Sequence, residues 1–137
     1  MANIEDRYKI LNFADLGDER GFLVVVEGGI QIPFDIKRIF YIYGSDATVV
    51  RGQHANLRSE FVLINVAGSS KVKVDDGNET RIINLDQPRM GIYLSKMLWK
   101  EMYDFSPDSV LLVLSNEHYD RAEYVRNYDD YIKMIKG

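Results

Sequence analysis

Short apolar runs separated by turn residues dominate the first 118 positions of the chain. Runs of four to eight β-branched and aromatic residues between Gly, Pro, Asp and Asn are typical of strands. We predict strands over Tyr8–Phe13, Phe22–Glu27, Ile36–Tyr43, Phe61–Val66, Lys71–Val74, Arg81–Leu85, Met90–Leu94, Leu98–Tyr103 and Val110–Leu114, with a further strand in the first part of Val50–Gly68. The run Phe22–Glu27 is almost continuously apolar, which favours a strand buried on both faces or at a subunit contact.

The pattern changes after residue 118. Tyr128, Ile132 and Ile135 recur at helical spacing with charged residues between them, which predicts one C-terminal helix. Many strands without alternating helices indicate an all-β antiparallel sandwich or jelly-roll barrel. We therefore expect a single domain over residues 1–137, with a barrel over about 8–118 and a helical tail over 119–137.

Composition narrows the function classes. The 137 residues include no cysteine, which excludes disulfides, thiol nucleophiles and Cys-ligated zinc. The net charge of −4 argues against a nucleic-acid-binding protein, although a few local arginines could still hold a small anion. We see no secretory signal and no apolar stretch of membrane-spanning length, so we expect a cytoplasmic protein without membrane contact.

The stretch Val50–Gly68 carries the clearest motif. Gly52, His54, Asn56, Glu60 and Gly68 have the spacing of a degenerate first cupin motif, in which a Gly, a His-x-His pair, a Glu and a closing Gly recur. Pro88-x-x-Gly91 followed by Trp99-Lys-Glu-Met resembles the second cupin motif.

Further motifs in the same order resemble one group of cupins, the WxcM-like sugar 3,4-ketoisomerases that act on dTDP-4-keto-6-deoxyglucose. These motifs are Asp18-Glu-Arg-Gly21, Ile36-Lys-Arg, Arg51-Gly-x-His54-Ala, Val74-Asp-Asp-Gly77, Trp99-x-Glu-Met-x-Asp-Phe105, Tyr119-Asp and Tyr124-x-Arg-x-Tyr-Asp129. The resemblance implies a jelly-roll cupin that forms a homodimer with exchanged N-terminal strands. The implied activity moves a carbonyl from C4 to C3 of a nucleotide-linked deoxysugar used for surface glycans. The chain departs from the family at Asn56, where a second histidine is usual, and at Lys100, where a histidine is frequent.

The implied reaction needs a base and hydrogen-bond donors rather than a metal. With only His54 and His118 available, no ligand cluster at metal spacing is visible, so we predict neither metal nor cofactor. A base with a pKa near neutrality removes a proton next to the carbonyl, and donors stabilise the enediolate. Histidine suits this role without a large pKa shift, so His54 is our catalytic candidate.

The sequence does not identify the other catalytic and substrate-binding residues as clearly as His54. Asn56 should share its face of the strand and could donate to the enediolate oxygen. A second proton-transfer group would come from Tyr41, Tyr43, Tyr93 or Glu101, among which the sequence does not choose; Tyr43 is placed with His54 and Asn56 in the predicted catalytic set. For the substrate we favour Arg51, because arginine presents paired donors to a pyrophosphate. Further substrate-binding candidates are Arg20, Arg38, Tyr41, Glu60, Tyr93, Trp99 and Glu101.

Two other functions remain compatible with the sequence. A dTDP-sugar epimerase of the same fold would also use a histidine base. A non-catalytic nucleotide-sugar-binding cupin would explain Asn56 and Lys100.

Overall fold

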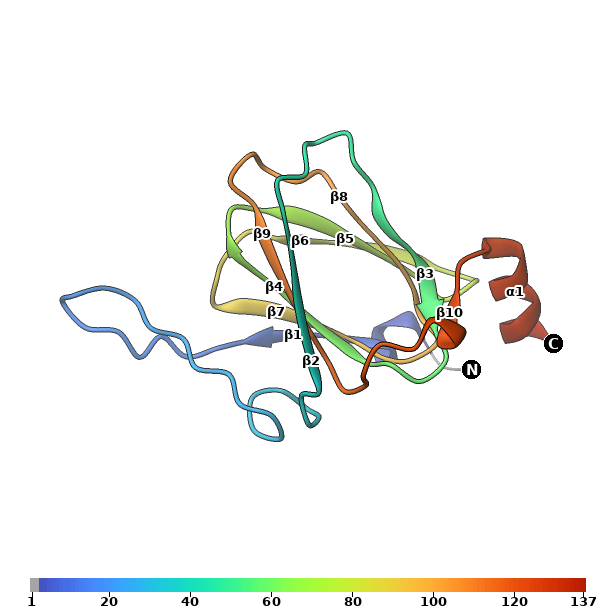
Figure 1. Cartoon of the computed structure of the whole chain (residues 1–137), viewed down its shortest axis with the longest axis horizontal. Helices are drawn as coiled ribbons and strands as arrows, with labels where there is room; N and C mark the ends of the chain where they lie inside the picture. Colours follow the sequence, from blue (N-terminus) through green and yellow to red (C-terminus); the bar gives the residue numbers. More distant parts are fainter. Residues whose placement is uncertain (1–2) are drawn as a thin grey trace.

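The computed structural model describes residues 3–137 as two five-stranded sheets packed face to face (Figure 1). The first sheet has the order β1 (Tyr8–Asn12), β7 (Met90–Leu94), β4 (Phe61–Ala67), β9 (Val110–Ser115) and β2 (Arg38–Tyr43). The second has the order β10 (Tyr124–Val125), β3 (Arg51–Asn56), β8 (Trp99–Tyr103), β5 (Ser70–Asp75) and β6 (Thr80–Leu85). All pairings between these strands are antiparallel, which confirms the predicted jelly-roll fold.

The main core lies between the two sheets. Strand β4 shows how the alternation of side chains builds it: Phe61 and Leu63 belong to the core between the sheets, where they are joined by Val72 and Val74 of β5. The intervening Val62 and Ile64 belong to a second apolar cluster with residues from the N-terminal part of the chain. Both faces of β4 are therefore covered, which explains its continuous apolar run.

A long arm over residues 14–37 joins β1 to β2 and projects away from the sheets (Figure 1). Ile32 and Phe34 anchor its returning end against the outer face of the first sheet. The predicted strand Phe22–Glu27 is wrong, because these residues form no ladder with any strand in the described part of the chain, residues 3–137. Burial on both faces is also not found, since Phe22 is 92% exposed.

The predicted C-terminal helix is confirmed as α1 (Tyr128–Lys136). The Asn127 side chain caps its first turn by accepting a hydrogen bond from the Asp130 amide. Tyr131 is fully buried against Trp99 and Ala55, so the helix covers the outer face of the second sheet. Two short 3-10 turns, Ile4–Asp6 (η1) and Arg121–Glu123 (η2), complete the secondary structure. No helix within residues 3–137 is long and apolar enough to cross a membrane.

The turn after β4 gives a test of the packing. Gly68 has φ +65°, and a Cβ built there would lie 2.8 Å from the Cα of Ser109. Gly44 also has positive φ but has open space around it. We expect Gly44→Ala to lower the free energy of unfolding by about 1–2 kcal/mol through backbone strain alone. Gly68→Ala should cost about 1–3 kcal/mol more through overpacking. Urea unfolding at one fixed protein concentration measures the free energy of unfolding of both variants. Equal destabilisation by Gly44→Ala and Gly68→Ala would contradict the clash at Gly68.

Candidate active site

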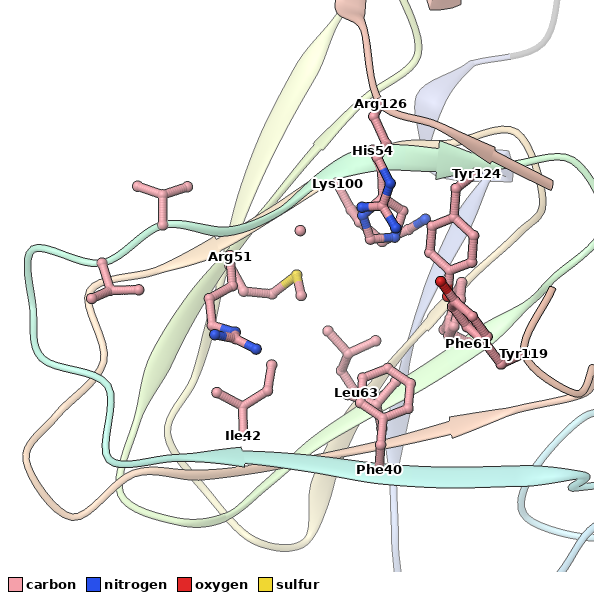
Figure 2. Close-up of a pocket in the computed structure, with 15 residues that line it drawn as sticks. Phe40, Ile42, Arg51, His54, Phe61, Leu63, Lys100, Tyr119, Tyr124 and Arg126 are labelled. Carbon is pink, nitrogen blue, oxygen red and sulfur yellow. The ribbon is translucent and has the colours of Figure 1, made fainter. Parts of the chain in front are cut away.

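A cavity of about 310 Å³ opens into the space between the sheets (Figure 2). Strands β2, β3, β4, β8 and β9 and the C-terminal tail all contribute to it. Its lining combines an apolar floor with several cations and tyrosines: Phe40, Ile42, Val49, Val50, Arg51, Gly52, His54, Phe61, Leu63, Lys100, Met102, Val113, Tyr119, Tyr124 and Arg126. Concave sites with an apolar lining and a few converging polar groups are the usual form of a small-molecule site.

An irregularity in β3 shapes the approach to His54. The pairing of β3 with β8 shifts register between Gly52 and His54, and the residue between them, Gln53, has φ +56°. Gly52 itself has φ +84°, and a Cβ there would lie 3.0 Å from the Lys100 carbonyl oxygen, so this position favours glycine. Beyond the bulge, His54 pairs directly opposite Lys100. Directly paired residues carry their side chains on the same face of a sheet, and both side chains enter the cavity.

Lys100 is a buried lysine with 2% exposure. Its Nζ donates a hydrogen bond to Asn56 Oδ1 at 3.2 Å and lies 4.8 Å from the centre of the Phe61 ring. Burial lowers the pKa of Lys100 from its ordinary range to about 7, with the attraction of Glu123 opposing the shift. The pKa of Lys100 therefore lies close to physiological pH, so both its charged and its neutral form are accessible.

His54 lies beside this cation. Burial, and next the charge of Lys100, lower the pKa of His54 to about 3, so the imidazole is neutral at physiological pH. This differs from the unshifted pKa that the sequence led us to expect. Within residues 3–137, the buried His54 Nδ1 has no hydrogen-bond partner. His54 is therefore a neutral imidazole with a nitrogen able to accept a proton.

Asn56 is fully buried and reaches the cavity only through Lys100. Its Oδ1 accepts the hydrogen bond from Lys100, while its Nδ2 has no partner among the described residues. The Asn56 amide, which does not itself line the cavity, thus orients the Lys100 side chain.

Of the predicted arginines, Arg51 is part of the cavity lining and Arg38 lies behind it, against three of the lining aromatic residues. Arg38 sits among aromatic rings, with its guanidinium carbon 5.5–5.8 Å from the ring centres of Phe40, Phe61 and Tyr119. Arg38 Nη1 donates to the Tyr124 hydroxyl at 3.1 Å, whereas its buried Nε and Nη2 have no partner in the part of the chain that the structure describes. Two such N–H groups suit an anionic oxygen.

Arg20 is not at this cavity. It is exposed on the projecting arm, where its guanidinium makes an ion pair with Asp18 at 2.6 Å.

The side-chain alternation of β2 and β8 turns four other predicted residues outward. In β2, Phe40 and Ile42 enter the cavity, so Tyr41 and Tyr43 stack on each other on the exposed face. In β8, Lys100 and Met102 enter the cavity. Trp99 and Glu101 therefore lie on the other face, where Trp99 Nε1 donates to Glu101 Oε2 at 3.1 Å and the indole packs on α1.

Glu60 and Tyr93 meet at a separate surface hollow. The Tyr93 hydroxyl donates to Glu60 Oε1, and Asn116 Nδ2 donates to Glu60 Oε2 at 3.0 Å. Burial, followed by the hydrogen bond to Glu60, raises the pKa of Tyr93. This pair joins β4 to β7 and does not line the cavity that contains His54.

The C-terminal tail closes one side of the cavity, because a buried glutamate fixes its path. Glu123 accepts hydrogen bonds from the backbone amides of Arg58 and Ser59 at 3.0 and 2.8 Å, and from the Ser59 hydroxyl. Burial raises the pKa of Glu123, but these hydrogen bonds outweigh it and the pKa is lowered overall. The carboxylate anchors the next residues, so that Tyr124 pairs with β3 and Arg126 reaches the cavity beside His54 (Figure 2).

Sequence reasoning missed four polar residues of the cavity: Lys100, Tyr119, Tyr124 and Arg126. Tyr124-x-Arg126 has the spacing that places both on one strand face, which was a usable signal. Lys100 lies in the apolar segment LWKEM, but lysine is almost always exposed, so its burial was not expected.

The described residues include no group of three or more His, Cys, Asp or Glu side chains that could hold a metal ion. His118, the second histidine, is exposed and does not line the cavity.

Residues 6–136 match the family model described as FdtA: WxcM-like, C-terminal. The chain belongs to this WxcM-like family.

Named relatives of the family are similar over almost the whole chain. A TDP-4-oxo-6-deoxy-α-D-glucose-3,4-oxoisomerase from Aneurinibacillus thermoaerophilus is 43% identical over 93% of this chain and 91% of its own. A 3,4-ketoisomerase from Helicobacter canadensis has a TM-score of 0.93 at 42% identity, covering 95% of this chain and 98% of the other. A histidine-to-asparagine mutant of the 3,4-ketoisomerase QdtA from Thermoanaerobacterium thermosaccharolyticum, in complex with TDP-4-keto-6-deoxyglucose, has a TM-score of 0.92 at 42% identity, covering 95% of this chain and 94% of the other.

The buried lysine predicts a pH-dependent stability. Between about pH 7 and 10 the folded chain has released the Lys100 proton while the unfolded chain still binds it, so unfolding takes up a proton and stability rises with pH. We expect the free energy of unfolding of the wild type, relative to Lys100→Met, to rise by at most about 1.4 kcal/mol per pH unit in this window. Urea unfolding of both proteins at several pH values measures the difference. A difference that does not change with pH would show that Lys100 titrates normally.

Proposed function

We propose that this protein is a sugar 3,4-ketoisomerase that converts TDP-4-keto-6-deoxyglucose into a TDP-3-keto-6-deoxyhexose through an enediol or enediolate. The observation that carries the proposal is a neutral His54, with an unpartnered nitrogen, in a cavity of a WxcM-like chain. The relatives named above support the same reaction and substrate, since they cover nearly the entire chain.

His54 acts as the carbon base in this proposal. The hydrogen on C3 of the substrate is acidified by the C4 carbonyl, and a positioned base can remove it while the carbonyl oxygen gains charge. The cationic groups around His54 stabilise that charge, because the surrounding cavity wall is apolar and weakly screening. The low pKa keeps His54 neutral at physiological pH, and the negative charge that develops on the substrate raises the proton affinity of the imidazole as it takes the proton.

The nucleotide end of the substrate would contact the arginines. Arg51 points into the cavity, and Arg38 offers two buried N–H groups beside aromatic rings. Guanidinium groups bind the oxygens of a diphosphate through paired hydrogen bonds. The exposed Tyr119, at the cavity edge, could stack on the sugar or the base.

We also propose that two chains form a homodimer by exchanging their N-terminal arms. The arm carries Phe22, Leu23 and Ile30, which are 92%, 53% and 69% exposed in one chain. Its apolar run has the composition of a strand and lacks a pairing strand within residues 3–137. Arg20 sits on this arm, so its predicted contact with substrate would be made in the cavity of the partner subunit.

The reaction is tested by incubating the protein with TDP-4-keto-6-deoxyglucose in deuterated water. We expect a 3-keto product that carries deuterium, detected by NMR. His54→Asn should abolish conversion because the amide cannot accept the proton. His118→Asn is the matched control and should keep wild-type activity, since His118 is exposed outside the cavity.

The other outcomes separate the alternatives. Inversion of a carbon centre with the carbonyl still at C4 would identify an epimerase. Tight binding of TDP without exchange or product would identify a non-catalytic binding protein. Either result would contradict the ketoisomerase.

The arm exchange is tested by light scattering coupled to size-exclusion chromatography. We expect the wild type to have twice the mass of the 15.8 kDa chain. Phe22→Asp should shift it toward monomer, because a charge would be placed in the proposed interface. Ile82→Asp is the control, since Ile82 is 59% exposed on β6, the edge strand of the second sheet. A monomeric wild type would overturn the dimer.

A further inference from the structure

The proposed reaction has a second proton transfer that His54 does not cover. Moving the carbonyl from C4 to C3 shifts one hydrogen from C3 to C4 and another from the C3 oxygen to the C4 oxygen. Two such transfers call for a carbon base and for an oxygen acid–base group. An acid–base group is most effective when its pKa lies close to the working pH.

The cavity offers Lys100 for the oxygen transfer. Its side chain enters the cavity from the position directly opposite His54, so a sugar that places C3 against the imidazole also places its oxygens near the ammonium. Nζ has no carboxylate partner among residues 3–137, and its hydrogen bond goes to the neutral Asn56 amide. No strong ion pair therefore fixes the proton on the nitrogen.

The other candidates are placed less well. Tyr41, Tyr43, Tyr93 and Glu101 do not line the cavity. The Tyr124 hydroxyl already accepts a hydrogen bond from Arg38, and Tyr119 is 60% exposed. Arginines remain protonated and can stabilise charge without moving a proton.

We propose that Lys100 is the second proton-transfer group of the active site, which exchanges one proton with the C4 and C3 oxygens while His54 moves the carbon-bound hydrogen. This inference rests on the proposed ketoisomerase function. In the first half, His54 takes the proton from C3, the C–H electron pair forms the C3–C4 double bond, and the carbonyl π pair becomes a lone pair on the C4 oxygen, which takes a proton from the Lys100 ammonium.

The second half restores both groups. The neutral Lys100 amine takes the proton from the C3 hydroxyl, whose O–H electron pair forms the new C3 carbonyl. The C3–C4 double bond takes a proton at C4 from the His54 imidazolium. Exchange of that imidazolium proton with solvent explains the deuterium expected in the product. No oxidant, reductant or co-reactant is needed.

The electrostatics couple the two transfers. A positive Lys100 lowers the pKa of His54, so His54 becomes a stronger base as Lys100 gives up its proton. The charged groups that bear on the pair come from several elements: Arg38 on β2, Arg51 on β3, Glu123 on η2 and Arg126 on the tail. Of these, Glu123 favours the charged lysine, whereas burial opposes it more strongly.

Two substitutions of Lys100 distinguish proton transfer from charge. Lys100→Met removes both, whereas Lys100→Arg keeps a cation that cannot release its proton. We expect each to lower kcat for the 3-keto product about 100-fold or more, the effect of losing a general acid–base group. The wild-type rate should fall above about pH 7 as the ammonium is lost, and this limb should be absent from the residual activity of Lys100→Met.

Binding of TDP, measured by calorimetry, shows that each variant is folded, and it should change by less than about threefold. Lys73→Met is the control, because Lys73 lies on β5 opposite Glu101, on the outer face of the same sheet, and should keep wild-type kcat. If the wild type turns over and Lys100→Arg retains its rate and pH profile, Lys100 acts through charge alone and the inference is overturned while the ketoisomerase stands. If the wild type gives neither exchange nor product, the proposed function itself fails.

Discussion

The burial of the Lys100 ammonium is the constraint on which the rest of the site depends. A buried charge is ordinarily matched by an opposite charge, yet the nearby Glu123 already holds the Ser59 hydroxyl and two backbone amides. The Lys100 ammonium donates a hydrogen bond to the Asn56 amide oxygen and lies over the face of the Phe61 ring. The neutral form of Lys100 therefore competes with its charged form, and the same charge adds to the burial that lowers the pKa of His54. The burial of this cavity wall and the charge of one lysine thus set the protonation of both titrating groups, Lys100 and His54.

Most of the fold was predictable because its elements are local patterns. Met90–Leu94 has the predicted bounds, and the helix beginning at Tyr128 follows from the spacing of its apolar residues. Phe22–Glu27 fails for a physical reason: a strand needs a partner for its backbone, and composition does not say where that partner lies. In the structure, Val24 and Val26 of this run pack against the second apolar cluster, whereas Phe22 and Leu23 are exposed.

The site was predicted in part, because period-two alternation separates two faces without naming the inner one. His54 and Arg51 line the cavity and Arg38 lies against its aromatic lining, whereas Tyr43 and Trp99 face outward. Strand β8 begins with two buried residues on opposite faces, Trp99 beneath α1 and Lys100 inside the barrel, so burial alone could not assign these side chains. Tyr124 and Arg126 are far from His54 in the sequence. They reach it because Glu123 fixes the path of the C-terminal tail beside β3.

Asn56 takes on a definite meaning beside Lys100. A carboxylate at this position would hold the lysine as an ammonium ion and oppose its deprotonation, whereas an aliphatic side chain would leave Nζ without an acceptor. An amide oxygen can accept a hydrogen bond from the ammonium and from the neutral amine alike, so it orients Lys100 in both states. The non-titrating Asn56 is therefore a suitable hydrogen-bond partner for Lys100, which has to change its protonation state in the proposed mechanism. On the proposed mechanism, asparagine at this position is compatible with activity, because Lys100 on β8 supplies the second proton transfer.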